Sequence, residues 1–191
     1  VLFYNISNPE NPTYYGRLNT ENARTVTLKN STAYIGDQLN LLTVDLSDPS
    51  NPVIIDSFEM SNAIKDIQLD QDRELLYIAL GTDGVAVFNP ATLSITANYN
   101  TTCLANRLSI SENKIAVSDW DDVEILDWDG TNLNIVGYKN TTRRTMAIAM
   151  KNNFVYSAEW KSLQVFEYGI INGPDIDLSN YEINYPYVED G

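Results

Sequence analysis

The sequence predicts an all-β fold built from a four-stranded antiparallel unit that recurs about every 40 residues. Two observations predict it. Residues 5–12 (NISNPENP) parallel residues 45–52 (DLSDPSNP) at an offset of 40 residues, and an apolar run precedes each segment. Within each period, short runs rich in Val, Ile, Tyr, Leu and Thr alternate with turn residues, which is typical of β-strands.

The repeat extends beyond these two copies. The apolar run recurs at residues 85–89, 123–127 and 163–167, so that successive runs are separated by 40, 44, 38 and 40 residues. A nearly constant period indicates one supersecondary unit that is used several times. We therefore expect four to five units in the chain.

The second copy defines the elements of one unit. Two tight hairpin turns are expected at residues 29–31 and 37–38, and a longer corner at residues 48–52, where two prolines exclude a helix. Four antiparallel strands in such a period are the signature of a β-propeller blade. The expected strands are residues 24–28, 33–36, 41–46 and 53–58.

Residues 41–52 (LLTVDLSDPSNP) strongly resemble the LVIVD repeat, a β-propeller repeat of secreted and cell-surface proteins of bacteria and archaea. Residues 33–37 (AYIGD) and 52–58 (PVIIDSF) also fit this repeat. The resemblance covers about residues 1–170 and weakens in the later copies. It implies an extracellular or cell-surface location and no established enzymatic activity.

The domain organisation follows from the repeat. We expect propeller blades over residues 1–172, beginning on the third strand of a blade. Residues 173–191 depart from the repeat and are interpreted either as a linker into an immunoglobulin-like module or as the last strand of a blade. Both ends suggest a segment of a larger multidomain chain.

The composition excludes several classes of function. The chain has 26 acidic and 12 basic residues, a net charge of −14, so it is not expected to bind nucleic acid. Without an apolar run of membrane-spanning length, direct membrane insertion is not expected. Histidine is absent, and Cys103 is the single cysteine, so a serine–histidine or cysteine–histidine pair is excluded. We therefore predict that the chain is not an enzyme.

Basic residues gather near the expected starts of the innermost strands. In a propeller these strands line the central channel, so the side chains could surround one channel mouth and bind an anionic ligand. The alternative is that they pair with nearby carboxylates such as Asp66. The candidate residues are Arg24, Lys65, Arg107, Arg143 and Arg144.

One stretch is densely acidic and holds two further kinds of candidate. Asp119, Asp121 and Asp122 could bind calcium, although the segment lacks the full calcium-loop pattern, and a solvated acidic turn is the alternative. No other cofactor is expected. Trp120 and Trp160 occupy the same repeat position and could stack on a partner protein or glycan, or instead pack between blades.

The favoured hypothesis is a non-catalytic interaction or scaffold module of a secreted or cell-surface protein, with a protein or glycan partner. One alternative is a structural subunit, cargo or accessory of a surface assembly or secretion apparatus. Another is a propeller-type hydrolase or lyase with a site at the channel mouth. In that case carboxylates should converge with Arg24, Lys65 and Arg107 in one pocket.

Overall fold

A computed structural model describes residues 1–141 and 143–169, so the predictions for residues 173–191 lie outside the described residues. The described chain is made of β-strands and turns, and it holds no helix long and apolar enough to cross a membrane. The strands are β1 (Leu2–Asn5), β2 (Thr13–Arg17), β3 (Ala23–Lys29), β4 (Thr32–Asp37), β5 (Asn40–Asp45), β6 (Val53–Glu59), β7 (Asp66–Asp70), β8 (Leu75–Ala79), β9 (Val85–Asn89), β10 (Ser94–Tyr99), β11 (Ala105–Ser111), β12 (Lys114–Asp119), β13 (Asp122–Trp128), β14 (Leu133–Asn140), β15 (Thr145–Lys151), β16 (Phe154–Glu159) and β17 (Leu163–Glu167).

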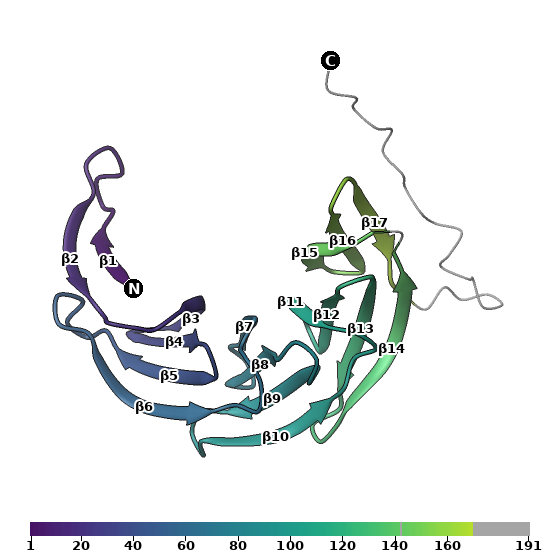
Figure 1. Cartoon of the computed structure of the whole chain (residues 1–191), viewed down its shortest axis with the longest axis horizontal. Helices are drawn as coiled ribbons and strands as arrows, with labels where there is room; N and C mark the ends of the chain where they lie inside the picture. The colour runs from purple at the N-terminus through teal and green to yellow at the C-terminus, as the bar shows by residue number, and fades with distance from the viewer. Residues whose placement is uncertain (142, 170–191) are drawn as a thin grey trace.

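The strands form antiparallel sheets in chain order, so the prediction of an all-β fold with four-stranded repeats is confirmed. Three sheets have four strands each: β3–β6, β7–β10 and β11–β14. A two-stranded sheet, β1–β2, precedes them, and a three-stranded sheet, β15–β17, follows them. Figure 1 shows the sheets along an open arc, with β3, β7, β11 and β15 on its concave side and β6, β10 and β14 on its convex side.

The first four-stranded sheet shows why these residues fold in this way. Each of its strands agrees with the expected range to within one residue at either end. Its two hairpins turn at Asn30 and Gln38, which adopt the left-handed conformation with φ of 53° and 56°. At the corner before β6, the backbone N–H of Asn51 donates to the carbonyl oxygen of Asp48 over 3.0 Å.

The apolar core lies between successive sheets rather than in one central mass. Each gap between neighbouring sheets holds its own cluster of buried side chains, as Ile64 and Leu76 exemplify between the first two complete sheets. Strands β8 and β9 of the middle complete sheet are therefore buried almost throughout, whereas β6 is mostly exposed. Residues on both faces of an inner sheet must therefore be apolar or paired.

Asp66 links three neighbouring sheets on the concave side of the arc. Its carboxylate accepts hydrogen bonds from Thr25 Oγ1 of β3 at 3.0 Å and from the backbone N–H of Leu108 of β11 at 2.9 Å. Asp66 is buried, so water does not compete for these hydrogen bonds. They hold β3 and β11 at a fixed distance from β7.

We expect Asp66→Asn to lower the free energy of unfolding by about 1–2 kcal/mol, because an amide has one acceptor oxygen where the carboxylate has two. Urea denaturation measures this change. Asp72→Asn removes an exposed carboxylate beyond the other end of β7 and should change stability by less than about 0.5 kcal/mol. Equal effects of the two substitutions would contradict the linking role of Asp66.

Candidate functional site

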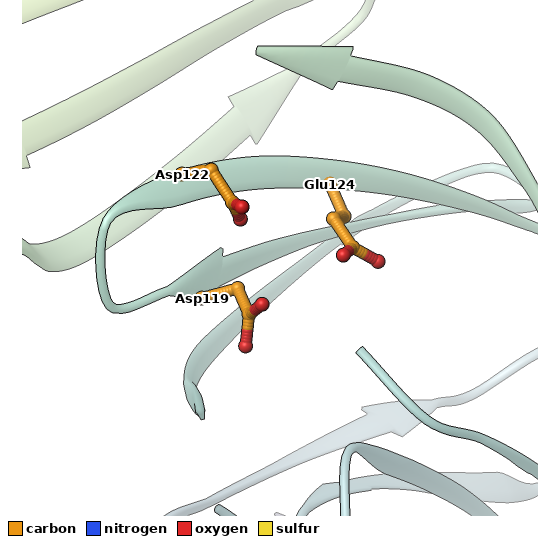
Figure 2. A group of neighbouring side chains, drawn as sticks. All are labelled: Asp119, Asp122 and Glu124. Atoms are coloured by element: carbon orange, nitrogen blue, oxygen red, sulfur yellow. The ribbon is translucent and has the colours of Figure 1, made fainter. Parts of the chain in front are cut away.

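Three carboxylates converge where β12 turns into β13 (Figure 2). Asp119 ends β12, Asp122 begins β13 and pairs with Asp119 across the hairpin, and Glu124 follows two residues later. Side chains two residues apart on a strand share one face, which places Glu124 on the same side as Asp122. The hairpin itself turns at Trp120, whose φ is 61°. We call Asp119, Asp122 and Glu124 the acidic cluster.

The loop that leads into β11 covers this cluster and anchors Asp119. Asp119 accepts hydrogen bonds from Thr101 Oγ1 at 2.7 Å, from the backbone N–H of Cys103 at 2.7 Å and from Thr102 Oγ1 at 3.0 Å. Asp37 of β4 anchors the corresponding loop in the same way, accepting from the backbone N–H groups of Glu21 and Asn22. Asp119 therefore has a structural role that the repeat shares.

Thr102 also contacts the other two carboxylates. Its Oγ1 lies 2.8 Å from Asp122 Oδ2, and its backbone N–H donates to Glu124 Oε1 over 2.9 Å. The hydroxyl groups of Tyr138 and Tyr99 also interact with Asp122 and Glu124. Even so, Asp122 Oδ1 and Glu124 Oε2 are buried and have no hydrogen-bond partner.

The repeat does not require the second and third carboxylates. In the first complete sheet, the strand-pair positions of Asp122 and Glu124 are filled by Asn40 and Leu42. Alignment of the apolar runs places Ala86 at the Glu124 position of the next sheet. Burying a carboxylate at a position that holds Leu42 in one sheet and Ala86 in another is costly, so the acidic cluster needs a reason beyond the fold.

The electrostatics of the acidic cluster are unbalanced. Asp122 is 2% exposed and Glu124 is 0% exposed. Within the described chain, the ion pairs are Lys29–Glu74, Arg73–Asp70 and Lys114–Asp127, so no cationic side chain pairs with the cluster. Burial, together with the nearby charge of Asp119, raises the pKa of Asp122 to about 6, and burial raises the pKa of Glu124.

This raised pKa predicts an unusual pH dependence for an acid. The pKa of Asp122 is about 6 in the folded protein and 3.8 for an ordinary aspartate. Below pH 3.8 the carboxyl group is protonated in both the folded and the unfolded state, so its ionisation costs no stability there. The cost grows as the pH rises towards 6 and amounts to at most about 3 kcal/mol above it. Urea denaturation between pH 4 and pH 7, without divalent cations, should show this loss of stability, and Asp122→Asn should remove it. An unchanged slope in that variant would contradict the assignment.

The basic candidates on the concave side do not join the acidic cluster. Arg24 lies exposed on β3, Lys65 directly precedes β7, and Arg107 on β11 donates from Nη1 to the Lys65 carbonyl oxygen at 2.8 Å. None of these three is in a described ion pair. Asp66 is bound by Thr25 and by backbone N–H groups instead, so the alternative of pairing with Asp66 is not realised.

Arg143 and Arg144 lie in the loop before β15, and both are exposed. The Arg144 guanidinium stacks over the Trp120 ring, with 4.2 Å between its carbon and the ring centroid. The Arg144 carbonyl oxygen accepts the backbone N–H of Trp160 at 3.0 Å, and the Trp160 side chain is 63% exposed. We call Trp120, Arg144 and Trp160 the Trp–Arg patch. Trp120 is half-buried beneath Arg144, whereas Trp160 faces solvent.

The sequence located two members of the acidic cluster and missed the third. Asp119 and Asp122 belong to it, whereas Asp121 is exposed and lies outside it. Glu124 was not among the candidates. Its alignment with buried Leu42 is the signal that identifies it, because a charged residue at a buried repeat position is exceptional.

Comparison with known proteins supports the repeat assignment. Comparison with curated proteins gives no match. Among solved structures, the computationally designed protein Ika4 is similar with a TM-score of 0.68 and 12% identity, over 79% of this chain and 94% of Ika4. The computationally designed protein Ika8 is similar with a TM-score of 0.61 and 12% identity, over 76% of this chain and 45% of Ika8. The chain thus spans less than half the length of Ika8, and at this identity both likenesses concern the fold alone. Residues 22–59 match the LVIVD repeat, which supports the resemblance to this repeat that the sequence indicates for residues 33–58.

Proposed function

We propose that this chain is a non-catalytic β-propeller module of a secreted or cell-surface protein and that it binds a protein partner through the Trp–Arg patch. The observation that supports this most directly is the exposed Trp160 beside an Arg144 that is already held on Trp120. Trp and Arg are enriched among the few residues that dominate binding energy at protein interfaces. A side chain ordered before binding also loses less entropy on binding.

A protein partner fits this patch better than a glycan. Sugar rings stack on open aromatic faces, but the Arg144 guanidinium covers a face of Trp120. Trp160 is then the one indole of the patch that is mainly exposed. An arginine beside a single open indole instead resembles the anchor residues of protein–protein interfaces.

The propeller assignment is supported by the order of the sheets. Successive sheets follow one another along the arc, with the first strand of each on the concave side (Figure 1), as blades do around a channel. Electron microscopy of the protein from its native source should show a closed ring of blades. An open or rod-like particle would contradict this assignment.

The carboxylates near the inner strands favour a binding module over an enzyme. A hydrolase or lyase at the channel mouth needs an available acid near Arg24, Lys65 and Arg107. Asp66 lies closest in sequence to Lys65, but it accepts bonds from Thr25, Leu108 and its own neighbour Ile67. These bonds give Asp66 the role of a structural acceptor.

The test compares partner capture by three forms of the protein. Wild type, Trp160→Ala and the control Ile6→Ala are immobilised and exposed to extracellular proteins of the native source, and the retained proteins are quantified by mass spectrometry. Ile6 is 70% exposed and lies in the loop after β1, far along the chain from the patch. We expect a protein that wild type and Ile6→Ala retain and Trp160→Ala loses.

The purified partner should then bind Trp160→Ala at least about tenfold more weakly than wild type. Arg144→Ala should weaken binding in the same direction, because it frees the Trp120 ring. Equal retention by all forms would contradict the proposal. Binding to a glycan array that depends on Trp160 would replace the protein partner with a glycan.

A further inference from the structure

We propose that Asp119, Asp122 and Glu124 form a binding site for one hard divalent cation, calcium, beneath the turn between β12 and β13. The site is distinct from the Trp–Arg patch and does not depend on any partner protein. Its residues come from two adjacent strands of one sheet, so their positions are fixed by the hairpin register.

The geometry suits a single ion. Each of the three side chains offers an oxygen, and these three oxygens all lie within 4.8 Å of one another. Calcium binds oxygen at about 2.3–2.6 Å, so oxygens on opposite sides of the ion are about 5 Å apart. One calcium ion can therefore contact all three carboxylates without rearrangement of the strands.

The unpartnered oxygens point to a ligand. Asp122 Oδ1 and Glu124 Oε2 are buried without a hydrogen-bond partner, although each residue's other oxygen accepts a bond from Thr102. Buried carboxylate oxygens are normally paired or bound to a metal. Figure 2 shows the three carboxylates converging from the two strands. A cation that contacts Asp122 Oδ1 and Glu124 Oε2 would give both oxygens the partner that they lack.

The Thr102 hydroxyl group lies between two of the three carboxylates. Thr102 Oγ1 lies 3.0 Å from Asp119 Oδ2 and 2.8 Å from Asp122 Oδ2, but a hydroxyl group has one hydrogen. The hydroxyl group can therefore donate to only one of the two carboxylates, and in the other contact two oxygens face each other without a hydrogen bond. A cation resolves this shortage, and a proton retained on one carboxyl group is the competing solution.

The other sheets show that the fold alone does not demand this charge. At the corresponding positions the first complete sheet has Asp37, Asn40 and Leu42, with one carboxylate, and the last sheet has Glu159, Ser162 and Gln164, also with one. In the last sheet Ser162 Oγ donates to Glu159 Oε2 over 3.0 Å. The three-carboxylate set is thus particular to the β11–β14 sheet.

The donor chemistry selects calcium. All three ligand groups are carboxylates, and the group includes neither histidine nor Cys103, so zinc and softer metals lack their preferred ligands. Magnesium prefers a smaller octahedral shell and keeps several waters, which a buried site with protein oxygens on several sides accommodates poorly.

Calcium binding is tested with the purified chain after treatment with EDTA. Calcium should raise the unfolding temperature in a saturable way, with a dissociation constant of about 10⁻⁴–10⁻³ M, as in extracellular calcium modules. Magnesium should act more weakly. Terbium, which substitutes for calcium, should show luminescence sensitised by Trp120 or Tyr99, and calcium should displace it.

Three substitutions, each removing one carboxylate, locate the site. Glu124→Gln keeps an acceptor for the Thr102 N–H and should weaken calcium binding at least about tenfold. Asp121→Asn and Asp56→Asn remove exposed carboxylates next to the cluster and far from it, and both should bind calcium as wild type does. Circular dichroism verifies that each variant is folded.

Two outcomes would overturn the proposal. The first is a wild type that responds neither to calcium at about 10 mM, above the weakest extracellular sites, nor to terbium. A proton would then satisfy the cluster. The second is a Glu124→Gln variant whose unfolding temperature rises with calcium as much as that of the wild type. The rise would then come from general screening of the negative charge of the chain by calcium. Neither outcome bears on partner capture by Trp160, so the two proposals fail separately.

Discussion

The Gly84→Ala variant is expected to lose more than about 4 kcal/mol of unfolding free energy. Gly84 precedes β9 with a φ of +73°, which side chains rarely adopt. A Cβ atom there would lie 2.1 Å from the Tyr99 carbonyl oxygen and 2.7 Å from the Thr101 nitrogen. The first is a backbone atom of the last residue of β10 and the second lies two residues beyond it, so relief requires the β9–β10 pairing to shift.

Gly130→Ala is the matched control for this prediction. Gly130 also has a positive φ, +96°, but no atom lies within 4 Å of the position where a Cβ would stand. Its substitution should cost only the backbone strain, about 1–2 kcal/mol. Urea denaturation of both variants separates strain from steric contact. Similar losses in the two variants would show that the close approach at Gly84 is not what limits stability.

The double variant Asp122→Asn/Glu124→Gln is expected to be more stable than wild type when calcium is removed, by roughly 2–4 kcal/mol at pH 7. Neutral amides remove two buried charges and keep acceptors for Thr102, and their N–H groups can donate to Asp119. Thermal unfolding in EDTA at pH 7 measures the gain.

The effect of calcium makes this prediction specific. Saturating calcium should raise the unfolding temperature of the wild type and leave that of the double variant unchanged. The difference in unfolding temperature between the two proteins should therefore become smaller than it is in EDTA. Asp56→Asn removes one exposed charge and controls for the reduced net charge of the chain. A double variant that is less stable than wild type in EDTA would mean that the buried carboxylates stabilise the fold by themselves.

The strands were predictable because turn residues and prolines mark their ends. The Asp48–Pro52 corner and the hairpins at Asn30 and Gln38 depend on local backbone preferences, which the sequence states directly. The spacing of the repeats then orders the sheets. The curvature of the arc was not predictable in this way. It depends on the angle between successive sheets, which many packing contacts determine together.

The acidic cluster was only partly predictable. In a strand with one solvated face, a charge such as Glu124 between Val123 and Ile125 is expected to point to water. In β13 both faces are buried between neighbouring sheets, so Glu124 points inward. The stacking of Arg144 on Trp120 joins two sheets, and it therefore depends on packing that sequence spacing does not encode.

Because each apolar cluster is confined to the gap between two sheets, the free energy of the molecule is close to a sum of single-sheet terms and nearest-neighbour interfaces. In such a system each sheet gains stability from every neighbouring sheet that packs against it. Amide hydrogen exchange should accordingly be slow in β8 and β9, whose sheet packs against a neighbour on both faces, and faster in β6, which is mostly exposed. Cooperative unfolding therefore depends on the interfaces between neighbouring sheets. A substitution in one gap should change the stability of a distant sheet only through the sheets that lie between them.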